Sequence, residues 1–114
     1  MIITSKKPYT IEEIVKLQEQ FGDYIKTVID LKKKVCSAGM DRHFEGEKIL
    51  LDQGSIQSEV WGGGIDTDEM VIDFNSMINI RPHQNNNSND ILNTDLRKQY
   101  EDLTKYFLKN LYDN

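Results

Sequence analysis

The C-terminal end of the chain carries an apolar stripe, and this stripe limits the folds open to the protein. Apolar residues recur there at intervals of three and four positions: Leu96, Tyr100, Leu103, Phe107 and Leu111. Such spacing places them on one face of a helix. A helix of this kind is stable in water mainly when its apolar face covers another apolar surface. The rest of the chain must therefore supply that surface.

Segments rich in β-forming residues supply it. Residues 24–31 and 35–38 are rich in Ile, Val and Thr and are separated by three lysines, which predicts a β-hairpin. Residues 56–65 and 70–80 flank four turn-forming residues and predict a second hairpin. Residues 1–4 add a short β-prone start. We therefore expect an α+β fold with a four- to five-stranded antiparallel or mixed sheet, and with the N- and C-terminal helices packed on one face.

Helix signals also precede the second hairpin. Thr10 opens the sequence Thr-Ile-Glu-Glu, which has the form of a capping box, and Gly22 suits a left-handed C-terminal cap. These signals predict a helix over residues 11–21. Asp41 can cap a shorter helix that Gly54 closes.

Length and composition narrow the class of protein. A chain of 114 residues fits one domain, so we expect a single domain over residues 1–114. No apolar run approaches the roughly 18–20 residues that span a bilayer, and no secretory signal precedes the fold, so we expect a cytoplasmic protein away from membranes. The net charge of −5 argues against nucleic-acid binding. The single cysteine, Cys36, has no metal-ligand spacing around it, and neither a metal ion nor an organic cofactor is predicted.

The second hairpin carries the main candidate for a functional surface. In an extended return strand, the residues expected on the core face are Met70, Ile72, Phe74, Ile78 and Ile80. The opposite parity carries four hydrogen-bonding side chains: Asp73, Asn75, Asn79 and Arg81. Val60, Val71 and Met77 would make the exposed surface of this hairpin partly apolar, and we therefore hypothesise a homodimer. Plain exposure of a polar face to solvent is the competing interpretation.

Arg81 is the centre of a binding hypothesis. Its guanidinium has a fixed fork of donors that suits carboxylate and phosphate, and Pro82 stiffens the backbone beside it. The other residues of this hypothetical site are Asp73, Asn79, Gln84 and Asn85. The chain would then be a small binding module for an anionic ligand, or for a protein partner on the same face. The alternative is an internal ion pair between Arg81 and an acid such as Asp73 or Glu45.

A small enzyme is the second functional hypothesis. His43, with Glu45 close by, could transfer a proton while Arg81 holds a charged substrate. A surface or capping histidine is the competing interpretation of His43. Trp61 is followed by three glycines but by no helix of the kind a phosphate-binding loop needs. The glycines therefore favour a bent strand or a close approach of another backbone.

Two segments of the chain carry a specific pattern. One is Gly54-Ser55-x-Gln57 followed by Trp61-Gly62, and the other is Asp73-Phe74-x-Ser76-Met77-Ile78-Asn79-Ile80-Arg81-Pro82. Together they resemble a small uncharacterised prokaryotic family of domains of unknown function, which implies one domain over most of the chain and no particular activity. The family closes its first hairpin with a glycine, where this chain has Lys34. It also has a Gly-Asn-Arg-Ser loop where this chain has residues 85–88, and Asn85 could adopt the left-handed conformation of that glycine.

Overall fold

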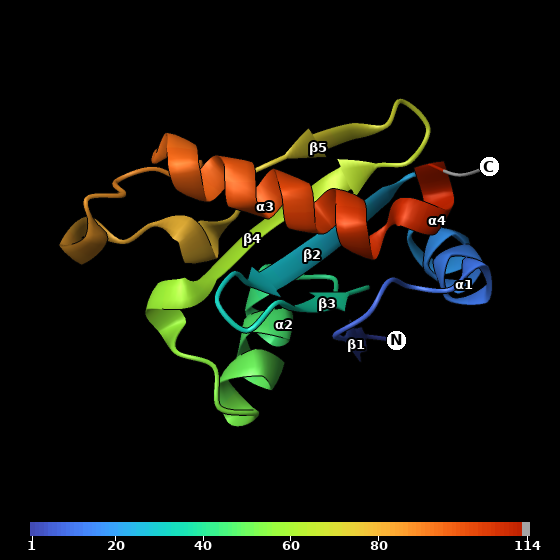
Figure 1. Cartoon of the computed structure of the whole chain (residues 1–114), viewed down its shortest axis with the longest axis horizontal. Helices are drawn as coiled ribbons and strands as arrows, with labels where there is room; N and C mark the ends of the chain where they lie inside the picture. Colours follow the sequence, from blue (N-terminus) through green and yellow to red (C-terminus); the bar gives the residue numbers. More distant parts are fainter. Residues whose placement is uncertain (113–114) are drawn as a thin grey trace.

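The computed structural model describes residues 1–112 and folds them around one five-stranded sheet (Figure 1). The strands are β1 (Ile3–Ser5), β2 (Tyr24–Asp30), β3 (Val35–Ala38), β4 (Val60–Asp66) and β5 (Val71–Asp73). In space they lie in the order β1-β3-β2-β4-β5, and each neighbouring pair is antiparallel. The predicted α+β class and the antiparallel sheet are therefore confirmed.

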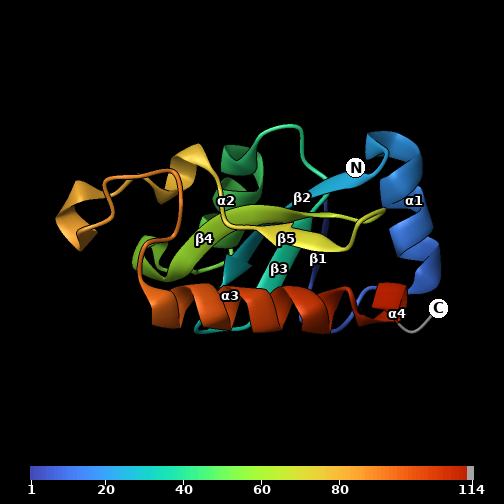
Figure 2. The same cartoon turned by 90° about the horizontal axis from the view of Figure 1, so that it is seen from above.

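Helices cover both faces of the sheet (Figure 2). They are α1 (Ile11–Phe21), α2 (His43–Asp52), α3 (Thr94–Phe107) and the short α4 (Lys109–Tyr112). Leu17 of α1 and Phe107 of α3 belong to one core cluster with Ile29 of β2, so the predicted packing of the first and last helices on one face is confirmed. On the opposite face, α2 covers a smaller core that contains Val28 and Leu50. Within residues 1–112, no helix is long and apolar enough to cross a membrane.

Local capping explains where α1 begins and ends. The Thr10 hydroxyl accepts a hydrogen bond from the Glu13 backbone N–H at 3.1 Å, and the Glu13 carboxylate accepts one from the Thr10 N–H at 2.9 Å. Gly22 ends the helix with a φ of +71°, in the region that favours glycine. The capping box and the helix over residues 11–21 are as predicted.

The glycines of β4 let neighbouring groups approach the strand closely. A Cβ on Gly63 would lie 2.3 Å from the Asp73 carbonyl oxygen and 2.9 Å from Cε1 of Tyr100. A Cβ on Gly64 would lie 2.3 Å from the Tyr24 hydroxyl oxygen. Close approach, one of the two structural roles predicted for these glycines, is therefore confirmed.

The return strand of the second hairpin is much shorter than predicted. β5 contains only Val71–Asp73, and the chain then forms 3₁₀ turns at Met77–Asn79 and Pro82–Gln84. The strand ends early because a side chain takes over its pairing role: the Asn79 amide accepts from the Gly62 N–H at 2.9 Å and donates to the Gly62 carbonyl at 2.8 Å. The predicted alternation of faces as far as Arg81 is therefore wrong.

A turn centred at residues 67 and 68 would place Trp61 opposite Phe74 across this hairpin, but β4 and β5 pair only over Gly64–Asp66 and Val71–Asp73. Trp61 lies opposite Ile29 of β2 in the sheet. Phe74 follows the end of β5 and packs against the same core cluster from a loop. The two aromatic residues therefore share a core without being strand partners.

Replacing Gly63 with Ala should lower the free energy of unfolding by about 1–3 kcal/mol, the usual cost of overpacking. The reason is that the new Cβ would meet the backbone of Asp73, which can move only if β5 moves away from β4. Gly64→Ala is the matched comparison and should cost less, because its nearest clash is with the end of the Tyr24 side chain, which is 37% exposed and can move. The nearest backbone atom to that Cβ, the Ile25 carbonyl oxygen, is farther away, at 2.9 Å. Urea unfolding measures both variants, and an equal or smaller loss for Gly63→Ala would contradict this explanation.

Candidate functional site

A pocket of about 340 Å³ opens where the N-terminus of α2 faces the turn that follows β5. Its lining residues are Lys26, Asp41, Arg42, His43, Phe44, Ser76, Met77 and Ile78. Gly62 of β4 makes room for this arrangement, because a Cβ there would lie 2.8 Å from Cβ of Ser76 and 3.1 Å from Cδ2 of His43. We call this cavity the α2 pocket.

His43 is the titratable group in the α2 pocket best suited to chemistry. Its Nε2 lies 2.7 Å from the Gly63 carbonyl oxygen. A carbonyl only accepts, so Nε2 carries the hydrogen and Nδ1 keeps its lone pair. Burial lowers the pKa of His43, and the charge of Lys26 lowers it further, against the opposing effects of the Gly63 bond and Asp73. The imidazole is therefore neutral at pH 7 and offers Nδ1 as an acceptor or base.

The charged side chains give the pocket a local positive excess. Lys26 and Arg42 line it together with a single acid, Asp41. The Lys26 ammonium donates to the backbone carbonyl of Asp41 at 2.7 Å, which fixes its position beside the pocket. This local balance is opposite in sign to the net charge of the whole chain.

Two large apolar side chains flank the same pocket. Phe44 is 55% exposed and Met77 is 76% exposed. Adjacent apolar groups of this size on a surface are typical of places where a ligand or another protein binds. The α2 pocket thus combines positive charge, one neutral histidine and an apolar rim.

Glu45 has a structural role next to His43. Its carboxylate accepts a hydrogen bond from the Arg42 backbone N–H at 2.9 Å at the start of α2. Arg42, and not the predicted Asp41, occupies the N-cap position. Gly54 follows the helix with a φ of +100°, as expected for a closing glycine.

Arg81 lies inside the protein, where its donors bind backbone carbonyls. The guanidinium donates to the carbonyls of Ile78, Gln57 and Val60, at 3.0 Å to Ile78 and 2.7 Å to Gln57. It is stacked 4.2 Å from the centroid of the Trp61 ring. Its nearest acid is Glu47, at 3.9 Å, and not the predicted Asp73 or Glu45. Arg81 therefore joins separate segments of the fold, and this placement argues against direct contact with an external anion.

The other predicted ligand-binding residues are divided among different places. Asn79 is fully buried and bound to Gly62. Asp73 accepts a hydrogen bond from the Tyr24 hydroxyl at 2.6 Å and lies close enough to influence the pKa of His43. Gln84 and Asn85 line a different pocket. The structure therefore brings His43 near Asp73 but separates both from the loop residues.

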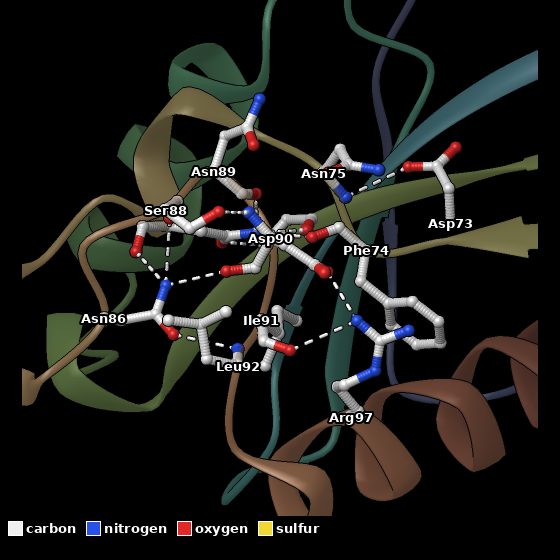
Figure 3. Close-up of polar contacts among 12 residues, drawn as sticks. Asp73, Phe74, Asn75, Asn86, Ser88, Asn89, Asp90, Ile91, Leu92 and Arg97 are labelled. Carbon is white, nitrogen blue, oxygen red and sulfur yellow. Dashed lines mark hydrogen bonds and ion pairs between the residues drawn. The ribbon is translucent and has the colours of Figure 1, made fainter.

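The loop after Arg81 is held by its own side chains (Figure 3). The Asn86 amide donates to the carbonyls of Asn79, Ser88 and Asp90 at 2.7 to 3.0 Å. Asn85, just before it, adopts the left-handed conformation with a φ of +59°, as predicted from the family's glycine. Lys34 is also left-handed, with a φ of +56°, at the other position where the family has a glycine. The chain thus keeps the glycine backbone geometry with different residues.

Arg97 anchors this loop to α3, as Figure 3 also shows. Its guanidinium pairs with Asp90 and donates to the Ile91 carbonyl at 3.2 Å. It also lies 4.1 Å from the centroid of the Phe74 ring. The same arginine therefore fixes both the loop and the segment that leaves β5.

Sequence reasoning missed Lys26 and Ser76 as pocket residues. Lys26 lies on β2 between the buried residues Ile25 and Thr27, so parity could have placed it on the α2 face of the sheet. Ser76 is buried and caps the following 3₁₀ turn through a hydrogen bond from the Ile78 N–H. No spacing signal links it to His43, because the two meet only over Gly62.

Fold and site together define a small α+β domain with a pocket at the start of α2. The pattern of the family described as "Protein of unknown function (DUF5674)" matches residues 1–107, and the chain belongs to this family. The predicted membership of an uncharacterised family is thereby confirmed. No curated protein and no solved structure gave a significant match to the chain.

His43 should make the stability of the protein depend on pH. Its pKa is lowered by burial from an ordinary value of about 6.5, so the unfolded chain takes up a proton at a higher pH than the folded protein. The contribution of the neutral His43 is therefore complete above about pH 6.5. It is lost as the pH falls from there through the lowered folded-state pKa.

Urea midpoints of the wild type and His43→Gln across this range measure the effect, with His83→Gln at the exposed second histidine as the matched control. The wild type should lose its advantage over His43→Gln as the pH falls. Parallel curves for these two proteins would show that the folded state does not perturb His43.

Arg81→Gln should lower the free energy of unfolding by about 3–5 kcal/mol, because it leaves the partly buried Glu47 without its cation. Arg97→Gln removes an ion pair that is about one-third exposed and should cost about 1 kcal/mol or less. Chemical unfolding compares the two. If Arg81→Gln were as stable as the wild type, Arg81 would be free for binding after all.

Proposed function

We propose that the protein is a small binding module whose α2 pocket holds a small anionic ligand with an apolar portion. One observation carries the proposal: Lys26, Arg42 and a neutral His43 line the same pocket as the exposed Phe44 and Met77. Pockets for small molecules typically combine apolar walls with a few convergent polar groups. The family is described as having no known function, so the proposal is based on the pocket itself.

Each lining group has a defined task in this proposal. Lys26 and Arg42 attract a carboxylate or phosphate, which they bind by charge-assisted hydrogen bonds. Nδ1 of His43 accepts a hydrogen from a hydroxyl or amide of the ligand. Phe44 and Met77 cover its apolar portion. We thus propose the α2 pocket as the anion site, in place of the site predicted around Arg81.

A small enzyme is the second candidate, and the free Nδ1 of His43 favours it. A neutral imidazole with a lowered pKa is ready to accept a proton from a bound molecule at neutral pH. Arg81, the predicted substrate-holding partner, does not line the α2 pocket, so Lys26 would take that role. Binding of the same class of anion precedes both functions, and it is the property to test first.

Thermal shift and titration calorimetry test the module with a series of carboxylates and phosphates of increasing apolar size. At 100 times its dissociation constant, a ligand should stabilise the fold by about 2.7 kcal/mol. Lys26→Met should remove most of this shift, because it deletes one of the two cations. Lys48→Met is the matched control, since Lys48 pairs with Asp52 on the exposed side of α2.

The proposal fails if no anion stabilises the wild type, or if Lys26→Met responds as the wild type does. Met77→Ser separates the apolar contribution: it should weaken the larger, more apolar anions and leave the smallest ones unchanged. Sedimentation of the ligand-free protein tests the hypothesis of a homodimer in the same samples.

A further inference from the structure

A second pocket, of about 350 Å³, lies between the loop after Arg81 and the start of α3. Its lining residues are Trp61, Gln84, Asn85, Asn86, Leu92, Asn93 and Leu96. Among the residues that the structure describes, none of those lining it is charged. It shares no residue with the α2 pocket. We call it the amide pocket, because four of its residues carry side-chain amides.

Trp61, which lines the amide pocket, has a buried donor without an acceptor. Trp61 is 1% exposed, and its indole Nε1–H has no hydrogen-bond partner within residues 1–112. Indole nitrogen can only donate. Buried polar groups in folded proteins are nearly always paired, and an unpaired one calls for a specific explanation. An acceptor atom supplied by a ligand is the explanation that also accounts for the cavity beside the ring.

The remaining free polar groups of the pocket are mainly donors as well. The Asn93 side-chain oxygen already accepts from the N–H groups of Asp95 and Leu96 at 2.9 and 3.0 Å, which leaves its NH₂ group. Asn86 is fully committed to the loop. Asn85 is exposed, and its side chain forms no hydrogen bond to any described residue. A ligand for this pocket must therefore present acceptor oxygen atoms.

The absence of lining charges decides between a neutral and an anionic ligand. Arg81, which is stacked on Trp61, does not line the pocket and already donates to three backbone carbonyls. A carboxylate brought next to Trp61 would therefore lose water without a direct contact to a cation, and such burial is costly. A carbonyl oxygen loses far less hydration and satisfies the same donors. Leu92, which is 51% exposed, and Leu96 give the pocket an apolar side.

We propose that the amide pocket binds a small uncharged molecule that carries an amide carbonyl beside an apolar group. The carbonyl oxygen accepts hydrogen bonds from Nε1–H of Trp61 and from the Asn93 amide, and the side-chain oxygen of Asn85 accepts one from the N–H of the same amide group. Leu92 and Leu96 contact the apolar group. Gln84 is the lining side chain with the freedom to make room, because within residues 1–112 it is held by two long hydrogen bonds of 3.3 Å, one to Ser58 and one from Arg81. This site is independent of the proposed function of the α2 pocket.

The chain offers a direct probe, since Trp61 is its single tryptophan. N-acetyl-leucinamide, which is neutral and has both amide carbonyls and an apolar side chain, is titrated while Trp61 emission is recorded. We expect a saturable shift of the emission, because a new hydrogen bond to Nε1 changes the surroundings of the excited ring. Acetate and inorganic phosphate serve as anionic probes of the same size class or smaller.

Three variants test the assignment. Asn85→Gly keeps the left-handed backbone, removes one exposed amide and should weaken binding roughly two- to tenfold, the loss of one neutral hydrogen bond. Trp61→Phe removes the N–H and should abolish the binding heat in calorimetry. Lys26→Met in the α2 pocket should leave the titration unchanged.

The experimental results for the amide pocket can be distinguished from those for the α2 pocket. No saturable change in Trp61 emission with the amide would overturn the site. A stronger response to acetate or phosphate would overturn its neutral specificity. Equal binding by the wild type and Asn85→Gly, or by Trp61→Phe if it folds, would show that the amide binds elsewhere.

Discussion

The fold depends on one side chain that replaces a strand. The amide of Asn79 makes both hydrogen bonds that a neighbouring residue of a β-strand would make with Gly62. It also donates to the carbonyls of Phe74 and Asn89, so a single buried group holds β4, the turn after β5 and the following loop together. Because pairing continues without a strand, the backbone at 74–78 is free to turn and to place Ser76 opposite His43. The α2 pocket is therefore a consequence of the Asn79 side chain taking the place of a strand.

Arg81 extends the same arrangement toward the other end of β4. Its three backbone acceptors come from the turn after β5 and from the segment that enters β4, and the Trp61 ring covers its planar group. A buried guanidinium is stable only when nearly all its donors are satisfied, and here they are satisfied by the chain itself. The local sequence around Arg81 would be the same whether its side chain were exposed for binding or buried as it is here. Only the course of the backbone after β5 decides between the two. That course is set by Asn79.

Structure that depends on neighbouring residues could be predicted from the sequence. The replacement of strand pairing by a side chain could not, because it depends on residues that are distant in the sequence. The capping box at Thr10 and the first hairpin depend on neighbouring residues, so α1, β2 and β3 lie where the pattern put them. The alternation after β5 has the period of a strand, yet no periodicity reveals that a side chain has replaced the backbone pairing. His43 was recognisable as a candidate because histidine titrates near neutral pH. Its pocket partner Ser76 was not, because the two meet only through the absence of a Cβ on Gly62. Parity could have placed Lys26 on the same face of the sheet, but not beside His43.

The buried arginine also bears on the chemistry of the neighbouring tryptophan. A cation over an aromatic face is attracted by the electron density of the ring and draws that density toward itself. The guanidinium of Arg81, 4.2 Å from the ring centroid, therefore leaves the Nε1–H of Trp61 a stronger donor than it would be in an apolar core. An unpaired strong donor is costlier to bury than an unpaired weak one. The stack that stabilises β4 would thus increase the gain when an acceptor enters the proposed amide site, which would couple the structural role of Arg81 to the proposed role of Trp61.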